Sequence, residues 1–271
     1  MSLSPIAFIG GGNMAGALVG GLLRSGWSAT DITAVEPSPA QRAVLESRFG
    51  VRTLAQADAT LRNAGCIVWA VKPQLFKAAA APCCEHVGGA LQLSVMAGIR
   101  SEAIARATGS DRVVRAMPNT PALIGQGMSG LYARAAVSAD ERTQVEKLLA
   151  PTGQTLWVDR EEQLDAVTAL SGSGPAYVFY LLEAWIEAGT AMGLSADQAK
   201  QLAVATLAGA TSLARDSDET PAALRERVTS KGGTTHAAIT SLEADGVRAA
   251  FVRALKAAEH RASELGDEFG R

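Results

Sequence analysis

The chain has 271 residues, of which 48% are hydrophobic and 19% charged, with a formal net charge of -2 at pH 7. This length favours two folded domains, and the scattered Lys and Arg residues argue against a nucleic-acid partner. The spacing of Cys66, Cys83 and Cys84 fits neither a metal site nor a disulfide framework, and the N-terminus resembles neither a signal peptide nor a membrane span, so we expect a cytoplasmic protein without a metal.

The first half of the chain alternates short apolar runs with stretches of helical periodicity. This alternation is typical of a parallel sheet flanked by helices. We expect strands at residues 6–9, 32–35, 66–71, 91–95, 113–116, 129–132 and 155–158, and helices at 14–25, 39–49, 73–84, 101–107 and 139–149. The pattern predicts an α/β fold, with an N-terminal Rossmann-like domain built on a doubly wound parallel sheet.

Strand signals stop near residue 160, and the remainder of the chain is helical in pattern. Ser195 with Gln198 resembles a capping box, and Thr220-Pro221 resembles a cap followed by proline at the first helical position. We therefore predict a dinucleotide-binding domain at residues 1–160 and an all-α substrate-binding and dimerisation domain at residues 161–271.

The predicted helices at 176–192 and 199–213 are apolar or small around much of their circumference. A surface helix needs a narrower apolar stripe, and a domain of roughly 110 residues has little capacity to bury such helices alone. We expect part of their surface to meet another subunit, as in a homodimer. A tight internal bundle is the alternative.

A glycine-rich turn is the first candidate binding site. Gly10-Gly11-Gly12-Asn13-Met14-Ala15 matches the G-x-G-x-x-A pattern and lies between a predicted strand and a predicted helix. In such a turn the backbone approaches a pyrophosphate at the N-terminus of the helix. We expect Gly10, Gly12, Asn13 and Met14 to bind a dinucleotide; an ordinary turn in a glycine-rich chain is the alternative.

Three side chains after the second strand bear on the choice between NADH and NADPH. Glu36 ends that strand about 20 residues after the turn, where an acidic side chain hydrogen-bonds the ribose hydroxyls of NAD and repels a 2′-phosphate. Ser38 and Arg42 follow closely, and a guanidinium there could bind that phosphate. We expect all three to contact the cofactor, although Arg42 could equally lie on a solvated helix face, and both cofactors remain open.

A second glycine cluster, Val228-Thr229-Ser230-Lys231-Gly232-Gly233-Thr234-Thr235, precedes a helix-patterned run. Free backbone amides at such a helix start form an anion site that suits a carboxylate. The alternative is an ordinary loop between helices with Ser and Thr caps.

Three further segments accompany these two clusters: Val71-Lys72-Pro73-Gln74, Arg115-Ala116-Met117-Pro118-Asn119-Thr120-Pro121 and Leu170-Ser171-Gly172-Ser173-Gly174-Pro175-Ala176. Together, and in this order, they closely resemble the pyrroline-5-carboxylate reductases, with a resemblance that runs from Ile6 to about Leu265. The resemblance implies a dinucleotide-binding domain followed by a helical domain that forms an interlocked dimer, assembled further into decamers in many members. It also implies NADPH as the usual cofactor, whereas Glu36 is an acid at a position where the family often has none.

The resemblance also implies roles for residues of this chain. Val71, Lys72 and Pro73 are expected beside the nicotinamide, and Met117 and Asn119 in the wall where cofactor and substrate meet. The substrate loop is expected to comprise Ser230, Gly232, Gly233, Thr234 and Thr235.

The expected reaction is hydride transfer from NADPH or NADH to the C=N carbon of 1-pyrroline-5-carboxylate, which gives L-proline, the last step of proline biosynthesis. Because an imine accepts hydride better when its nitrogen is protonated, we expect the Thr235 hydroxyl to orient or relay that proton as the catalytic residue.

Two other functions fit parts of the sequence. A β-hydroxyacid dehydrogenase shares the glycine-rich first turn, but it carries a catalytic lysine on the helix after its second glycine motif, and the residues after Gly174-Pro175 contain no lysine nearby. A nucleotide-binding protein without turnover would keep the same fold, so the fold alone cannot exclude this second function.

Overall fold

The computed structural model describes residues 3–269. Their contacts divide the chain into two compact units. The first unit ends at Gly174 and also includes the chain from Ala257 onward; the second runs from Pro175 to Lys256.

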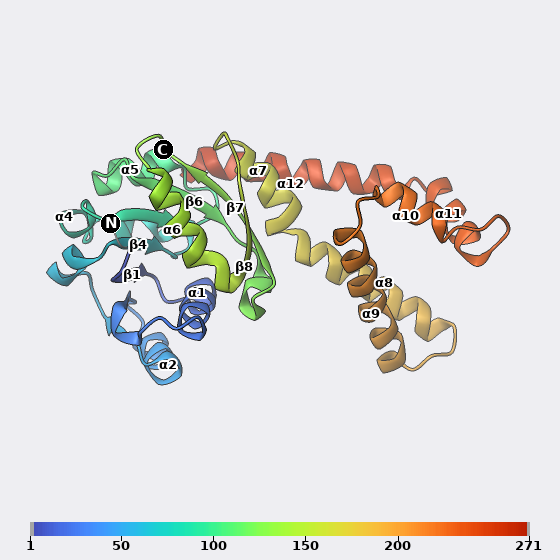
Figure 1. Cartoon of the computed structure of the whole chain (residues 1–271), viewed down its shortest axis with the longest axis horizontal. Helices are drawn as coiled ribbons and strands as arrows, with labels where there is room; N and C mark the ends of the chain where they lie inside the picture. The colour runs from blue at the N-terminus through green and yellow to red at the C-terminus, as the bar shows by residue number, and fades with distance from the viewer. Residues whose placement is uncertain (1–2, 270–271) are drawn as a thin grey trace. The chain divides into compact units, whose positions relative to one another are not determined.

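The first unit is built on a sheet whose strand order is β3-β2-β1-β4-β5-β6-β7-β8 (Figure 1). The strands are β1 (Ile6–Ile9), β2 (Ile32–Val35), β3 (Arg52–Leu54), β4 (Cys66–Trp69), β5 (Leu91–Ser94), β6 (Val113–Met117), β7 (Gly127–Ala133) and β8 (Gly153–Trp157). Neighbours from β3 to β6 pair in parallel, and the order reverses direction beside β1, as in a doubly wound fold. The predicted fold class is confirmed.

The sheet is parallel from β3 to β6 but not at its far edge. β7 pairs antiparallel with β6, and β8 pairs parallel with β7. Only the short 3-10 helix η4 (Thr120–Ile124) separates β6 from β7, whereas a parallel connection needs a crossover of a dozen residues or more.

Helices cover both faces of this sheet: α1 (Asn13–Arg24), α2 (Pro39–Phe49), α3 (Phe76–Ala80), α4 (Cys84–Val87), α5 (Ser101–Thr108) and α6 (Ala139–Leu149). Because successive strand residues point to opposite faces, Ile6 and Phe8 of β1 pack with α1, α2 and α6, while Ala7 and Ile9 pack with α3, α4 and α5. Two buried cores therefore hold the sheet rigid where β1 and β2 end.

The helix expected at residues 73–84 is broken into the 3-10 helix η3 (Pro73–Leu75), α3 and α4. Pro82 lies between α3 and α4, and it has no backbone N–H to continue a helical ladder. The strand β3 was missed by the sequence analysis because Arg52-Thr53-Leu54 is short and has no apolar run.

Partly buried ion pairs tie three segments of this unit together. The Glu161 carboxylate accepts hydrogen bonds from the Ser101 amide and hydroxyl at 2.6 Å each and pairs with Arg115 at 2.8 Å. Asp165 of α7 (Gln163–Val167) pairs with Arg100 at 2.8 Å. These contacts fix the stretch that leads into the π-helical turn η6 (Thr168–Gly172).

The second unit is helical, with α8 (Gly174–Ala191), α9 (Ala196–Arg215), α10 (Pro221–Arg227), α11 (Thr234–Ala244) and the first part of α12 (Val247–Phe269). Ser195 and Gln198 form the predicted capping box of α9. Thr220 caps α10 through the Ala223 amide, with Pro221 at the first helical position, as predicted.

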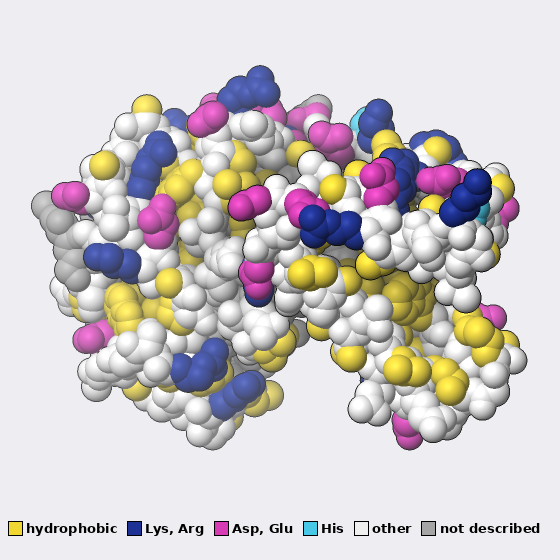
Figure 2. Space-filling model, turned by 45° about the vertical axis from the view of Figure 1, so that its right-hand side comes forward, with side chains coloured by type: hydrophobic (Ala, Val, Ile, Leu, Met, Phe, Trp, Pro, Cys, Tyr) yellow, Lys and Arg dark blue, Asp and Glu magenta, His cyan; other side chains and the backbone are white. Residues whose placement is uncertain are grey.

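Large apolar side chains of this unit remain at its surface (Figure 2). Those at least one-third exposed are Val178, Phe179, Tyr180, Trp185, Met192, Leu194, Leu202, Val204, Leu213, Val228, Leu242, Phe251 and Val252. A tight internal bundle would bury many of them, so the exposure favours a second subunit as their cover. Within residues 3–269, every helix is too short or too polar to cross a membrane.

Candidate active site

The glycine turn joins β1 to α1 at the carboxyl end of the sheet. Gly10 has φ of +99°, and a Cβ placed there would lie 2.7 Å from the carbonyl oxygen of Ala70. Only glycine fits both the backbone conformation and the close approach of the chain that follows β4. The fold itself therefore requires Gly10.

Gly12, the residue that precedes α1, is a different case. Its φ of -70° and ψ of -170° suit any residue, and a Cβ placed there would meet no atom within 4 Å. Because neither strain nor packing demands a glycine, the missing side chain leaves room for an approaching ligand. The exposed helix start beside it offers free amides of the kind that bind a pyrophosphate.

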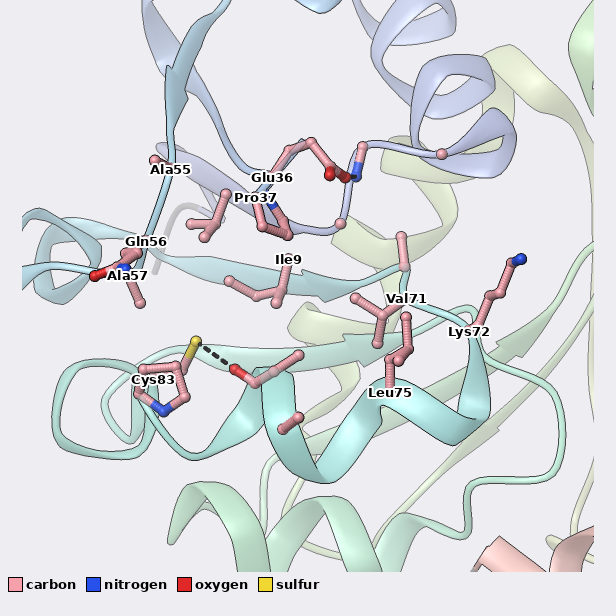
Figure 3. Close-up of a pocket in the computed structure, with 18 residues that line it drawn as sticks. Ile9, Glu36, Pro37, Ala55, Gln56, Ala57, Val71, Lys72, Leu75 and Cys83 are labelled. Carbon is pink, nitrogen blue, oxygen red and sulfur yellow. Dashed lines mark hydrogen bonds between the residues drawn. The ribbon is translucent and has the colours of Figure 1, made fainter. Parts of the chain in front are cut away.

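The Glu36 carboxylate bonds the glycine turn itself. One oxygen accepts from the Gly11 amide at 2.9 Å (Figure 3), and the other accepts from the Ser38 amide at 2.9 Å. The side chain is half-buried and lines a pocket beside the turn. Its charge thus lies at the end of β2, the position where an adenosine ribose is bound in folds of this kind.

Ser38 and Arg42 both bond the chain around the start of α2. The Ser38 hydroxyl caps α2 by accepting from the Gln41 amide. Arg42 donates through Nη1 to the carbonyl oxygens of Glu36 and Pro37, at 2.8 and 2.9 Å. Arg42 therefore lies against the backbone beside Glu36 and forms no ion pair with that carboxylate among the described residues.

A pocket of about 660 Å³ opens beside the turn. Its lining includes Gly10, Gly11, Gly12, Glu36, Val71 and Lys72, and beyond them Ala55, Gln56, Ala57, Ala78, Ala79, Pro82 and Cys83. The volume is in the range of sites that hold drug-sized ligands, and the lining is mostly apolar with a few polar groups. The turn and the pocket together fit the adenosine and pyrophosphate of a dinucleotide.

Val71 and Lys72 extend this lining after β4, and Pro73 begins η3. The Lys72 side chain is exposed and extends away from the other labelled side chains (Figure 3). Burial raises the pKa of the Cys83 thiol to about 11, with a minor contribution from Cys84, so the thiol lines the pocket in its neutral form.

Met117 and Asn119 lie at the end of β6, outside that lining. The Asn119 side chain donates to the carbonyl and hydroxyl oxygens of Ser171, at 3.3 and 3.2 Å, and accepts from the Met128 amide at 2.9 Å. Asn119 therefore links η6 to β7, and π-helical turns of this kind are frequent at functional sites.

The predicted substrate loop connects α10 to α11. Gly232 has φ of +77°, which only glycine adopts readily, and the Gly233 amide donates to the carbonyl of Ser230 at 3.0 Å. The loop is largely exposed, with Thr235 half-buried in the first turn of α11. Its geometry leaves the first amides of α11 open to an anion.

The two predicted sites share one local feature. Serine or threonine side chains cap α2, α6, α9 and α10. α1 and α11 begin after Gly12 and Gly233 with no side-chain cap, as do the shorter helices α3, α4, α5 and α7, whose N-cap residues are not glycines. The amides that a cap would satisfy are left for another acceptor at both sites.

Comparison with known proteins identifies the family. Residues 161–265 match the model of the pyrroline-5-carboxylate reductase dimerisation domain, and residues 5–98 match that of the coenzyme F420-dependent NADP oxidoreductases. A pyrroline-5-carboxylate reductase from Pseudomonas aeruginosa is 45% identical over the full length of both chains. One from Haemophilus influenzae is 38% identical, with 96% of this chain and 97% of that protein covered.

The chain belongs to the pyrroline-5-carboxylate reductase family.

Solved structures of this family have the same fold. A pyrroline-5-carboxylate reductase from Coxiella burnetii superposes with a TM-score of 0.90 at 36% identity, over 97% of this chain and 99% of that one. The Plasmodium falciparum pyrroline carboxylate reductase with NADP bound gives a TM-score of 0.88 at 26% identity, over 98% and 99%. The chain is therefore a nicotinamide-dependent oxidoreductase with a homo-oligomerisation domain.

Two parts of the site in this reductase were not predicted from the sequence. Gln41 of α2 donates to the carbonyl oxygen of Gly11 at 2.6 Å, although nothing in its sequence surroundings marks it. Ala55, Ala57, Ala78, Ala79 and Pro82 on the far side of the pocket bear no functional group that a motif would identify. Their role is shape, which appears only after folding.

Proposed function

We propose that the chain reduces 1-pyrroline-5-carboxylate to L-proline, the last step of proline biosynthesis. The observation that carries the proposal is the pair of uncapped helix starts in a chain of this family, one beside the pocket and one in the Ser230–Thr235 loop. The first suits a pyrophosphate and the second a carboxylate. When bound, the reduced nicotinamide supplies the hydride.

We propose that residues 1–160 bind the cofactor and residues 161–271 bind the substrate and dimerise. The dimerisation model, which begins at residue 161, supports this division. Gly10, Gly12, Asn13 and Met14 would hold the pyrophosphate, Glu36, Ser38 and Arg42 would face the adenosine ribose, and Val71, Lys72, Pro73, Met117 and Asn119 would flank the nicotinamide.

The amides of Gly232, Gly233 and Thr234, with the Ser230 hydroxyl, would hold the substrate carboxylate. The Thr235 hydroxyl has no hydrogen-bond partner among residues 3–269, so it is free to bond the substrate nitrogen. Hydride addition to the C=N carbon forms a C–H bond, and the nitrogen takes a proton to become an amine. Thr235 would orient or relay this proton, which comes from solvent or from a substrate already protonated.

Glu36 leads us to propose NADH as the preferred cofactor. Its carboxylate lines the pocket, and Arg42, the nearest candidate to neutralise it, bonds backbone carbonyls instead. An uncompensated carboxylate disfavours a 2′-phosphate with its own negative charge. Arg42 retains other donors toward a phosphate, so NADPH should also be used, with lower efficiency.

We propose that the chain forms a homodimer through the helical unit, and that larger assemblies such as decamers are built from these dimers. We also propose that the protein is cytoplasmic, because its three free thiols fit a reducing compartment.

A spectrophotometric assay tests this proposal. The loss of NADH and of NADPH is followed by the absorbance of the reduced nicotinamide, with 1-pyrroline-5-carboxylate as substrate, and proline is identified among the products. Turnover with hydroxyisobutyrate and none with pyrroline-5-carboxylate would overturn the proposal, as would tight cofactor binding without any turnover.

A further inference from the structure

Both peptide groups of Gly11 are held by side chains from the segment that follows β2. The Gly11 amide donates to the Glu36 carboxylate at 2.9 Å, and its carbonyl oxygen accepts from Nε2 of Gln41 at 2.6 Å. Gly11 is buried, whereas Gly12 beside it is exposed. The backbone is therefore fixed one residue before the open position.

Packing adds a second restraint from the same helix. A Cβ at Gly11 would lie 2.7 Å from Cδ1 of Leu45, so the absence of a side chain lets α2 approach the turn. Gln41 and Leu45 are four residues apart on α2, and residues at this spacing lie on one helix face. That face of α2 thus meets Gly11 with one hydrogen bond and one apolar contact.

The planarity of the peptide bond transmits this restraint to the ligand side. The carbonyl of Gly11 and the amide of Gly12 belong to one peptide plane and point in opposite directions. Holding the oxygen with Gln41 therefore fixes the direction of the Gly12 N–H. The Gly11 N–H is already taken by Glu36, which leaves Gly12 and the first residues of α1 as the donors facing open space.

We propose that Gln41 is a positioning residue that orients the Gly12 amide for a pyrophosphate before the cofactor binds. This inference rests on the proposed cofactor role of the turn. Because NADH and NADPH share the pyrophosphate, Gln41 sets the affinity for both and leaves the preference between them unchanged. An amide that is already oriented loses less conformational entropy when the ligand binds, and this raises the affinity.

The test compares Gln41→Met, which keeps the length of the side chain and removes its donor, with Gln154→Met as matched control. Gln154 of β8 is exposed, lies outside the pocket lining, and its side chain has no hydrogen bond within residues 3–269. Dissociation constants are measured by calorimetry for NADH, NADPH, ADP-ribose and adenosine, without substrate. For Gln41→Met we expect Kd to rise about three- to tenfold for the three pyrophosphate ligands, the range of one ordinary hydrogen bond. Adenosine, which has no phosphate, should bind as before.

Kinetics provide a second measurement. With saturating NADH, kcat of Gln41→Met should equal that of the wild type while KM for NADH rises by the same factor as Kd. If the Gln41→Met variant does not fold, the same measurements are made with Gln41→Ala. Equal Kd values in wild type and Gln41 variants, a change confined to NADPH, or an equal loss in Gln154→Met would each overturn the inference. A wild-type protein that binds no dinucleotide would overturn the proposed function as well, so the two failures are distinct.

Discussion

Gly10 and Gly12 lie in the same turn, but the folded backbone requires a glycine only at Gly10. Gly10→Ala should destabilise the protein by roughly 1–3 kcal/mol, because a side chain at φ of +99° is strained and meets Ala70. Gly12→Val should leave the melting temperature nearly unchanged and raise the Kd of NADH more than about tenfold, or 1.4 kcal/mol, by blocking the pyrophosphate. Thermal melts and NADH titrations of both variants provide the comparison.

A Gly12→Val protein that binds NADH with wild-type affinity would show that no ligand approaches this turn. Loss of stability in that variant would instead point to a structural role that the open space around Gly12 does not suggest.

Glu36 and Arg42 should shift cofactor preference in opposite directions. Glu36→Gln removes the charge that opposes a 2′-phosphate, so we expect the NADPH-to-NADH ratio of kcat/KM to rise about tenfold. This change is about a third of the roughly 4 kcal/mol between two unit charges 4 Å apart near a protein surface. Arg42→Ala should lower the same ratio, since its guanidinium is the nearest donor to a phosphate. A ratio that moves in neither variant would place the ribose elsewhere.

Thr235 is predicted to act on turnover more than on binding. Thr235→Ala should lower kcat by up to about 100-fold, the lower end of what general acid-base groups contribute, with little change in the Kd of NADH. Thr235→Ser should recover much of the activity because it restores the hydroxyl. The variant must first be shown to keep its oligomeric state. Wild-type turnover in such a Thr235→Ala protein would leave substrate recognition to the backbone amides of the loop.

The local sequence predicted these site residues unequally well. Gly10, Gly12 and Glu36 were predicted from the dinucleotide pattern, and the structure brings them to one pocket, although their binding roles remain predictions. Gln41 was not predicted because its contact with Gly11 spans 30 positions and depends on how α2 packs on the turn. For Arg42, the sequence could not distinguish a phosphate ligand from the observed donor to backbone carbonyls.

At the scale of elements, strong local signals gave correct bounds. β1, β2, α2 and α6 begin and end where the sequence predicts, since each has an apolar pattern bounded by a cap, a proline or a glycine. The direction of β7 could not be read from its own residues, because pairing direction depends on the length of the connection to β6. Pro82 is a signal for a break in the helix expected at residues 73–84, but the apolar pattern of that stretch favoured one continuous helix.

Glu161 should make the attachment of α7 sensitive to acid. Burial would raise the pKa of Glu161, but hydrogen bonds from Ser101 and the charge of Arg115 hold it below the ordinary value of 4.5. A carboxyl with a lowered pKa in the folded state stabilises the protein above its unfolded-state pKa, and this stabilisation is lost as pH falls through the folded-state pKa. The stabilisation should therefore be full above about pH 5 and disappear on acidification below pH 4.5.

Glu161→Gln tests this expectation. At neutral pH it should lower the free energy of unfolding by roughly 3 kcal/mol, because Arg115 is left buried without its partner. The difference from wild type should shrink as the pH is lowered. Glu102→Gln is the control, since Glu102 forms an exposed ion pair with Arg106 that is worth less than about 1 kcal/mol. Denaturant unfolding at several pH values would contradict the prediction if both variants behaved alike.

At the scale of the whole molecule, the apolar surface of the helical unit predicts that assembly can be broken by one charge. Phe179 of α8 is 57% exposed in the single chain. Phe179→Glu should reduce the mass measured by light scattering to that of a monomer, because burying an unpaired carboxylate at an interface is costly. Leu156 of β8, 53% exposed but outside the helical unit, provides the control Leu156→Glu. An unchanged mass for Phe179→Glu would place the interface on another face.

The missing side-chain caps of α1 and α11 have a thermodynamic consequence. A serine or threonine cap typically contributes about 1 kcal/mol to a helix, and Gly12 and Gly233 provide no side chain for this role. An anion that binds at either place completes the hydrogen bonds of the first helical turn. Binding and local ordering are then one equilibrium, so each ligand should slow hydrogen exchange at the start of its own helix. In this sense the pyrophosphate and the carboxylate act as the capping groups that the polypeptide does not encode.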